Sequence, residues 1–220
     1  MKFWKWVKNE SERILYLDGY IAENSWFDDD VTPEEFKNEL QREKGDITVW
    51  INSPGGDAFA AAKIYNMLKE YKGKITVKID GLAASAASVI AMAGDEILMS
   101  PVGMLMIHNP STMVWGEETD MKKGIALLSE VKESIMNAYE SKTGLSRSKI
   151  SNMMDKETWM SAKKALDLGF CDEILYDKET SSVTDFMFDK VTVTNSFMSK
   201  VKNENKRDVK ELYKRLELLK

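Results

Sequence analysis

His108 is the only histidine in the 220-residue chain, so acid–base chemistry near neutral pH would centre on it. It follows the apolar run Met104–Ile107 and precedes Asn109 and Pro110. A histidine at the junction of a predicted strand and a loop is well placed to face a cleft. Taken alone, however, a histidine is more often structural than catalytic, so a catalytic role requires partner residues.

Ser85 is a second residue that could do chemistry. It lies in the small-residue segment 81–88 (GLAASAAS), between a predicted strand and an alanine-rich helix. The N–H groups at a helix N-terminus suit an oxyanion that forms beside a serine nucleophile. The same small residues also allow close helix packing, which is the only role we predict for Ser88. The segment lacks the G-x-S-x-G sequence of α/β-hydrolases.

Residues 52–56 (NSPGG) form a third candidate, because every position is of a turn-forming type. The predicted turn follows a strand and precedes a helix, so its glycine N–H groups could approach an anion closely. It matches neither the Walker A sequence nor G-x-G-x-x-G, which disfavours nucleotide binding. A tight turn with no further role is the alternative interpretation.

The elements that must position these residues alternate between strands and helices. Predicted strands span residues 14–17, 47–51, 75–79, 96–99, 104–107 and 174–176. The first predicted helix begins with a capping box at residues 32–35 (TPEE). Further helices are predicted over residues 57–71, 84–93, 118–139, 147–153 (with Ser146 as N-cap) and 162–168. This order predicts an α/β fold with a mostly parallel sheet covered by helices.

Composition and charge exclude several kinds of binding partner and indicate the cellular compartment. With 31 Lys+Arg against 36 Asp+Glu, the net charge of −5 argues against a nucleic-acid binder. The chain has a single cysteine, Cys171, so it cannot form an internal disulfide. The lack of disulfides is typical of proteins in a reducing cytoplasm. One cysteine and one histidine also exclude a Cys/His zinc site. No apolar run approaches the ~20 residues of a membrane span, and residues 1–10 lack the apolar core of a secretory signal. We therefore expect a cytoplasmic protein with no membrane partner.

Amino-acid composition and charge change along the chain and suggest three segments. We expect an N-terminal segment at residues 1–11, an α/β domain at 12–178 and a charged C-terminal extension at 179–220. In the extension, residues 198–220 hold eight Lys+Arg and four Asp+Glu. An apolar seam there predicts a short terminal helix, either frayed or docked on a subunit or partner; it consists of Val209, Leu212, Leu216 and Leu219.

Several segments, in this order, resemble the proteolytic subunit of Clp protease. The matching segments are residues 51–56, 81–86 and 106–110, followed by Met160-Ser161-Ala162 with Ala165, Gly169 and Asp172. The resemblance covers residues 12–177. It implies a ClpP/crotonase-type α/β fold, with repeated β-β-α units and a protruding handle helix at residues 118–139. It also implies a serine endopeptidase that hydrolyses peptide bonds in protein substrates.

The resemblance assigns site residues by position. Ser85 would be the nucleophile and His108 the general base. The family's oxyanion hole would fall on the backbone N–H groups of Gly56 and Ala86, and no metal or organic cofactor is implied. Ala86 stands where the family commonly has methionine, a change that leaves a backbone contact intact.

The third member of the catalytic triad is a choice between two carboxylates. The family has an aspartate four residues before its Ser/Thr-Ala pair, and here that position is Glu157, with Asp155 as the alternative. Glutamate can orient a histidine, but its extra methylene demands a different backbone placement. The segment 157–160 (ETWM) and Asp57 look most like the Clp-type peptidases of phages and prophages. Those peptidases are associated with head maturation, in which scaffold or capsid proteins are cut.

The resemblance also implies self-assembly. Relatives form homo-oligomeric rings, commonly heptamers and often stacked in pairs, with the handle helix joining the rings. The amino end does not resemble the axial loops that engage an unfoldase, so dependence on an ATPase partner stays open. Two alternatives also stay open. One is a crotonase-type enzyme that handles acyl-CoA, which would not need Ser85 with His108. The other is a catalytically latent assembly component; this alternative stays open because Glu157 replaces the aspartate of the family.

Overall fold

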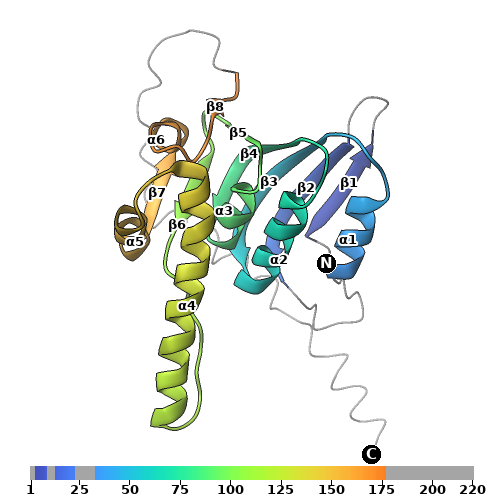
Figure 1. The fold of residues 1–220 in the computed structure, drawn as a ribbon. Helices are drawn as coiled ribbons and strands as arrows, with labels where there is room; N and C mark the ends of the chain where they lie inside the picture. Colours follow the sequence, from blue (N-terminus) through green and yellow to red (C-terminus); the bar gives the residue numbers. More distant parts are fainter. Residues whose placement is uncertain (1–2, 9–12, 23–32, 177–220) are drawn as a thin grey trace, which may run out of the picture. The chain divides into compact units, whose positions relative to one another are not determined.

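A computed structural model describes residues 3–8, 13–22 and 33–176, all within one unit of the chain, Met1–Lys178 (Figure 1). Its sheet has the strand order β1-β2-β3-β4-β5-β8, with β6 paired to β4, and β7 to β6. Pairing is antiparallel for β1–β2 and β6–β7 and parallel elsewhere. The strands are β1 (Trp4–Lys8), β2 (Arg13–Ile21), β3 (Ile47–Gly56), β4 (Ile75–Ala84), β5 (Glu96–Met99), β6 (Met104–Ile107), β7 (Thr158–Ser161) and β8 (Glu173–Ile174).

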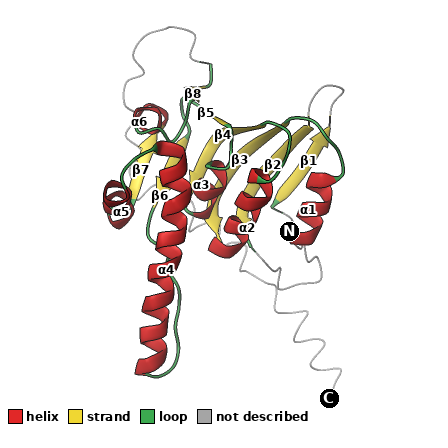
Figure 2. Cartoon of the chain, viewed as in Figure 1, coloured by secondary structure: helices red, strands yellow, loops and turns green. Residues whose placement is uncertain are grey.

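The helices cover the sheet, except for one that extends beyond it. They are α1 (Pro33–Gln41), α2 (Ala58–Lys69), α3 (Ala86–Ala91), α4 (Glu118–Thr143), α5 (Arg147–Asp155) and α6 (Ala162–Asp167). In Figure 2, α1, α2 and α3 lie against the same face of the sheet, and most of α4 projects past its edge. The α/β architecture is as predicted. The long helix ends four residues later than predicted, where Gly144 adopts a left-handed conformation.

Local sequence signals explain where most elements begin. The strand pattern of β3 alternates fully buried Ile47, Val49 and Ile51 with half-buried residues, as expected for a strand with one face on the core. Helix α2 begins after Asp57, whose carboxylate accepts a hydrogen bond from the Ala60 N–H at 2.8 Å. Ser146 caps α5, as predicted.

The predicted turn at residues 52–56 is wrong, because β3 continues to Gly56. The register between β2 and β3 shifts after Asp18, so the strand bends without ending. The Ser53 hydroxyl stabilises this bend by donating to the Gly19 carbonyl at 2.6 Å and accepting from the Gly55 N–H at 3.1 Å. β4 likewise runs on to Ala84, so the alanine-rich helix begins later than predicted.

Two strands were not predicted. β1 pairs with β2, and its Trp4 is buried against Phe36 in an edge-to-face contact with ring centroids 5.2 Å apart. β7 pairs with β6 and leads into α6. The predicted terminal helix and its apolar seam fall outside the described residues.

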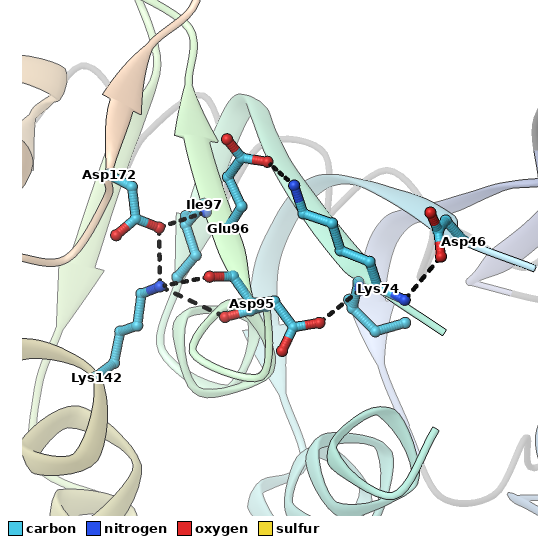
Figure 3. Close-up of polar contacts among 9 residues, drawn as sticks. Asp46, Lys74, Asp95, Glu96, Ile97, Lys142 and Asp172 are labelled. Carbon is cyan, nitrogen blue, oxygen red and sulfur yellow. Dashed lines mark hydrogen bonds and ion pairs between the residues drawn. The ribbon is translucent and has the colours of Figure 1, made fainter. Parts of the chain in front are cut away.

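Polar contacts tie the C-terminal end of α4 to the sheet (Figure 3). Lys142 Nζ lies 2.8 Å from Asp172 Oδ2, and the same carboxylate oxygen accepts the Ile97 N–H of β5 at 2.7 Å. The Lys142 side chain is 14% exposed and the Asp172 side chain 44%, so water reaches the pair from the carboxylate side. The base of the projecting helix is therefore anchored to β5 and to the segment before β8.

Candidate active site

Ser85 and His108 meet where two neighbouring strands end. Ser85 follows β4 and His108 follows β6, and the parallel pairing of these strands places Ala84 opposite Met106. His108 Nε2 lies 2.7 Å from Ser85 Oγ, a hydrogen bond between residues 23 positions apart. The structure thus brings together the two residues that the sequence singled out. A hydroxyl in this contact with a neutral imidazole is the arrangement of a serine nucleophile and its general base.

The backbone of Ser85 adopts a conformation that side-chain-bearing residues rarely take. Its φ is 55° and its ψ is −124°, at the N-cap of α3. Its N–H donates to the Met106 carbonyl at 2.9 Å, and its carbonyl accepts the Ser88 N–H at 2.9 Å. Strain of this kind costs roughly 1–3 kcal/mol and persists where the surroundings enforce it. The segment therefore forms a strained strand-to-helix turn without the G-x-S-x-G sequence.

The two glycines that end β3 allow the chain to pass close to this turn. A Cβ at Gly55 would lie 2.8 Å from Ser85 Cβ and 2.9 Å from the Ala86 nitrogen. A Cβ at Gly56 would overlap the Ile21 carbonyl. Both have positive φ angles, 98° and 147°, which favour glycine. The β3 backbone and the N-terminus of α3 thus lie against each other beside Ser85.

A cavity of about 270 Å³ adjoins Ser85 and His108. Gly56 and Ala86 also line it, which places both predicted oxyanion-hole residues at the same cavity. Its far wall is mainly apolar and comes from α4; it includes Leu128, Val131, Ile135 and Tyr139. A cavity of this size and lining can accept an apolar side chain next to the nucleophile.

Burial sets the protonation state of His108. The pKa of the imidazole is lowered from its ordinary 6.5, chiefly by burial, and the negative charge of Glu157 opposes this shift. The ring is therefore largely neutral at pH 7. A neutral ring that accepts from Ser85 at Nε2 is ready to take up the serine proton.

Glu157 is the carboxylate whose charge acts on His108. It is half-buried directly before β7, with a positive φ of 48°. Its Oε1 accepts a hydrogen bond from the indole Nε1 of Trp159 at 3.2 Å. A positive φ is uncommon for a residue with a side chain. Trp159 is a partner that the sequence analysis did not anticipate.

Asp155, the alternative carboxylate, is engaged elsewhere. Its Oδ1 accepts from Lys132 Nζ at 2.7 Å and from Asn109 Nδ2 at 2.9 Å. These two contacts lower the pKa of Asp155. Asp155 thus bridges α4 and the loop that follows His108. Among the described residues, no group of three or more His, Cys, Asp or Glu side chains could hold a metal ion.

Ser88 does more than the packing predicted for it. Its hydroxyl donates to the Ser85 carbonyl at 2.6 Å and lies 2.7 Å from the hydroxyl of Tyr139. The spacing of three residues from Ser85 is a local signal that could have indicated the first contact, because a helical serine often bonds to a carbonyl one turn back. No local signal indicates Tyr139, which is 51 positions from Ser88.

Comparison with known proteins bears on this arrangement of residues. Residues 8–178 match the family model described as Clp protease. The chain belongs to the Clp protease family. Its relatives include ATP-dependent Clp protease proteolytic subunit 1 of Chlamydia abortus, 34% identical over 134 residues, which are 59% of this chain and 70% of that protein. The corresponding subunit of Chlamydia trachomatis serovar D is 33% identical over the same length.

A solved structure confirms the ClpP-type fold. A ClpP1 mutant from Listeria monocytogenes matches with a TM-score of 0.64 and 25% identity, over 75% of this chain and 92% of that one. Membership in the Clp protease family supports a serine-type peptidase. In the part of the chain that the structure describes, no helix combines the length and apolar character needed to cross a membrane.

Proposed function

We propose that this member of the Clp protease family is a serine endopeptidase with a Ser85–His108–Glu157 triad. The observation that carries the proposal is the 2.7 Å contact between Ser85 Oγ and His108 Nε2, beside a cavity with an apolar wall from α4. In this scheme Glu157 orients His108 and stabilises its protonated form. Asp155 is the weaker candidate, because Lys132 and Asn109 occupy its carboxylate.

The reaction proceeds through an acyl-enzyme. Ser85 Oγ forms a bond to the scissile carbonyl carbon while His108 takes the hydroxyl proton. The C–N bond then breaks, and His108 gives this proton to the leaving amine. In the second half, water attacks the acyl carbon while His108 takes a proton from it. The ester C–O bond to Ser85 then breaks, and His108 returns the proton to Ser85 Oγ. No metal or organic cofactor takes part in these steps.

The oxyanion of each tetrahedral intermediate would be held by the backbone N–H groups of Gly56 and Ala86. Support comes from the cavity, which both residues line beside Ser85. The close approach of Gly55 to the Ser85 turn brings the end of β3 to the same point. A donor of this kind contributes roughly 3–4 kcal/mol to transition-state stabilisation.

The substrate class follows from the family and from the cavity. Family membership supports a protein or peptide substrate, and the apolar wall from α4 favours an apolar side chain next to the scissile bond. The segment 157–160 and Asp57 resemble the phage and prophage branch, so a capsid or scaffold protein is the substrate we propose. Whether an ATPase delivers the substrate is a separate question, which activity assays with and without an unfoldase would answer.

We propose a homo-oligomeric ring, heptameric or stacked as a double ring, in the cytoplasm or an assembling phage head. Large apolar side chains on α4 and the segment before it support association, because they are exposed in the single chain. Trp115 is 84% exposed, Met113 78% and Ile125 70%. Such side chains are usually buried when a protein assembles.

The test is labelling with a fluorophosphonate, followed by mass mapping of the modified residue. We expect a stoichiometric adduct on Ser85, its absence in Ser85→Ala, and strongly slowed labelling in His108→Ala. The assembled protein is used, since its ring is part of the proposal. No adduct on the assembled wild-type chain would contradict the proposed nucleophile and favour a latent assembly component.

A further inference from the structure

The nucleophile's backbone is connected to α4 by two side-chain hydroxyls. Ser88 Oγ donates to the carbonyl of Ser85 at 2.6 Å and lies 2.7 Å from Tyr139 Oη. Both side chains are fully buried, with Ser88 0% and Tyr139 1% exposed. Two short hydrogen bonds thus connect the C-terminal part of α4, the longest described helix, to Ser85.

The direction of this chain is determined by its hydrogens. Ser88 has a single hydroxyl hydrogen, which it donates to Ser85, so Tyr139 must be the donor to Ser88 Oγ. Burial raises the pKa of Tyr139 far above its ordinary 10.0, so the phenol stays protonated and can donate throughout the working pH range. Both hydroxyl hydrogens therefore point toward the Ser85 carbonyl.

The other end of the chain is held in place by the fold. The Tyr139 ring packs against Phe170 with centroids 5.7 Å apart, and the Thr143 hydroxyl donates to the Tyr139 carbonyl at 2.7 Å. One turn further on, Lys142 anchors α4 through Asp172 (Figure 3). Tyr139 therefore lies on the part of α4 whose position the sheet fixes.

We propose that Tyr139 and Ser88 are positioning residues that hold the strained backbone of Ser85 in the reactive conformation. This inference rests on the proposed function of Ser85 as the nucleophile. The Ser85 N–H donates to the Met106 carbonyl of β6. The Ser85 carbonyl accepts the Ser88 hydroxyl at 2.6 Å, the Ser88 N–H at 2.9 Å and the Val89 N–H at 3.4 Å. The hydroxyl makes the shortest of these three contacts, so its loss is expected to let the strained residue, with φ at 55°, relax in part. A shift of the carbonyl would move Oγ relative to His108 and reduce the fraction of productive encounters.

The experiment compares Tyr139→Phe, Ser88→Ala and the double variant in the full-length assembled chain. Tyr139→Phe keeps the ring that lines the cavity and removes only the donor. Three quantities are measured: the rate of fluorophosphonate labelling at Ser85, kcat and KM for a fluorogenic peptide, and the melting temperature. Tyr71→Phe is the control, since it removes the hydrogen bond of a half-buried tyrosine to the Gly45 carbonyl, away from the cavity beside Ser85.

We expect each single variant to lower the labelling rate and kcat about three- to tenfold, with KM changed less than about twofold. Because the two hydroxyls act in series, the double variant is expected to be no slower than Ser88→Ala. Its melting temperature should exceed that of Ser88→Ala, since that single variant leaves the buried Tyr139 hydroxyl without its acceptor. Tyr71→Phe should lower the melting temperature and leave kcat unchanged.

The outcomes separate a positioning role from a purely structural one. Loss of activity in the double variant that persists while its melting temperature recovers supports the proposal. Activity that rises and falls with melting temperature across the series overturns it. Unchanged labelling and kcat in Tyr139→Phe overturn it as well, and leave the proposed function standing. Failure of the wild-type chain to label at Ser85 overturns the proposed function, and this inference with it.

Discussion

The indole N–H of Trp159 donates to the carboxylate of Glu157 at 3.2 Å, from two positions further along the chain. Glu157 is also the carboxylate whose charge raises the pKa of His108 against the effect of burial. The indole therefore fixes a side chain that has one more rotatable bond than an aspartate. This contact, the charge of Glu157, the close packing at Gly56 and the ion pair of Lys142 each lead to a prediction.

Trp159→Phe should lower kcat about threefold, because it frees one carboxylate oxygen of Glu157 but keeps an aromatic ring in place. The measurement is peptide hydrolysis at saturating substrate. Trp50→Phe is the control, since Trp50 is a half-buried tryptophan on β3 that does not line the cavity beside Ser85. In a Glu157→Gln background the Trp159 substitution should have a much smaller effect; an equal effect in both backgrounds would show that the indole does not act through Glu157.

The pH dependence of kcat/KM should identify the carboxylate that acts on His108. The base must be neutral, and burial lowers its pKa, so the acidic limb is expected below pH 6.5. Glu157→Gln removes a negative charge that favours the protonated ring, so the limb should move to still lower pH. The plateau should fall at least about tenfold, because the protonated intermediate loses its stabilising charge.

Asp155→Asn is the matched control for the pH experiment. Asp155 contacts Lys132 and Asn109, and we expect its substitution to leave the acidic limb in place. A shift with Asp155→Asn and none with Glu157→Gln would exchange the roles that we assign to the two carboxylates.

Gly56→Ala should destabilise the fold by more than about 2 kcal/mol and abolish peptide hydrolysis. A Cβ there would overlap the Ile21 carbonyl, and the φ of 147° is unfavourable for alanine. Urea denaturation followed by circular dichroism measures the change. Gly144→Ala is the control, because its φ is also positive but nothing lies within 4 Å of the added Cβ. Its cost should stay near about 1 kcal/mol, and equal costs at both sites would argue against the close approach at Gly56.

Lys142→Met should lower the free energy of unfolding by about 1 kcal/mol, since the Lys142 side chain is mostly buried and it pairs with Asp172 at 2.8 Å. Lys122→Met removes an exposed pair with Glu118 on the same helix, and we expect a change within about 0.5 kcal/mol. The two free energies of unfolding are compared by urea titration. Equal values would indicate that the base of α4 is not anchored through Asp172.

The sequence by itself was sufficient to predict the α/β alternation and most helix starts, and to single out Ser85 and His108, which the structure places in contact. These follow from information that is local along the chain: a capping residue such as Asp57 or Ser146, an alternating apolar strand, a lone histidine between a strand and a loop. The sequence did not predict the end of β3, because the turn-forming residues 52–56 bend this strand without ending it. Whether such residues end a strand depends on the neighbouring strand, which here supplies the Gly19 carbonyl to Ser53.

Only the tertiary structure decided which groups act on one another. Glu157 and Asp155 are two residues apart and chemically alike, yet the backbone at Glu157, with φ at 48°, separates their surroundings. The contact of Ser88 with Tyr139 joins residues 51 positions apart, and hydrogen bonding requires distances of about 3 Å that no sequence pattern specifies. Residue types and spacing thus predicted which side chains of this chain could take part in chemistry. The packing of α4 and the pairing of β4 with β6 determined where each of those groups lies.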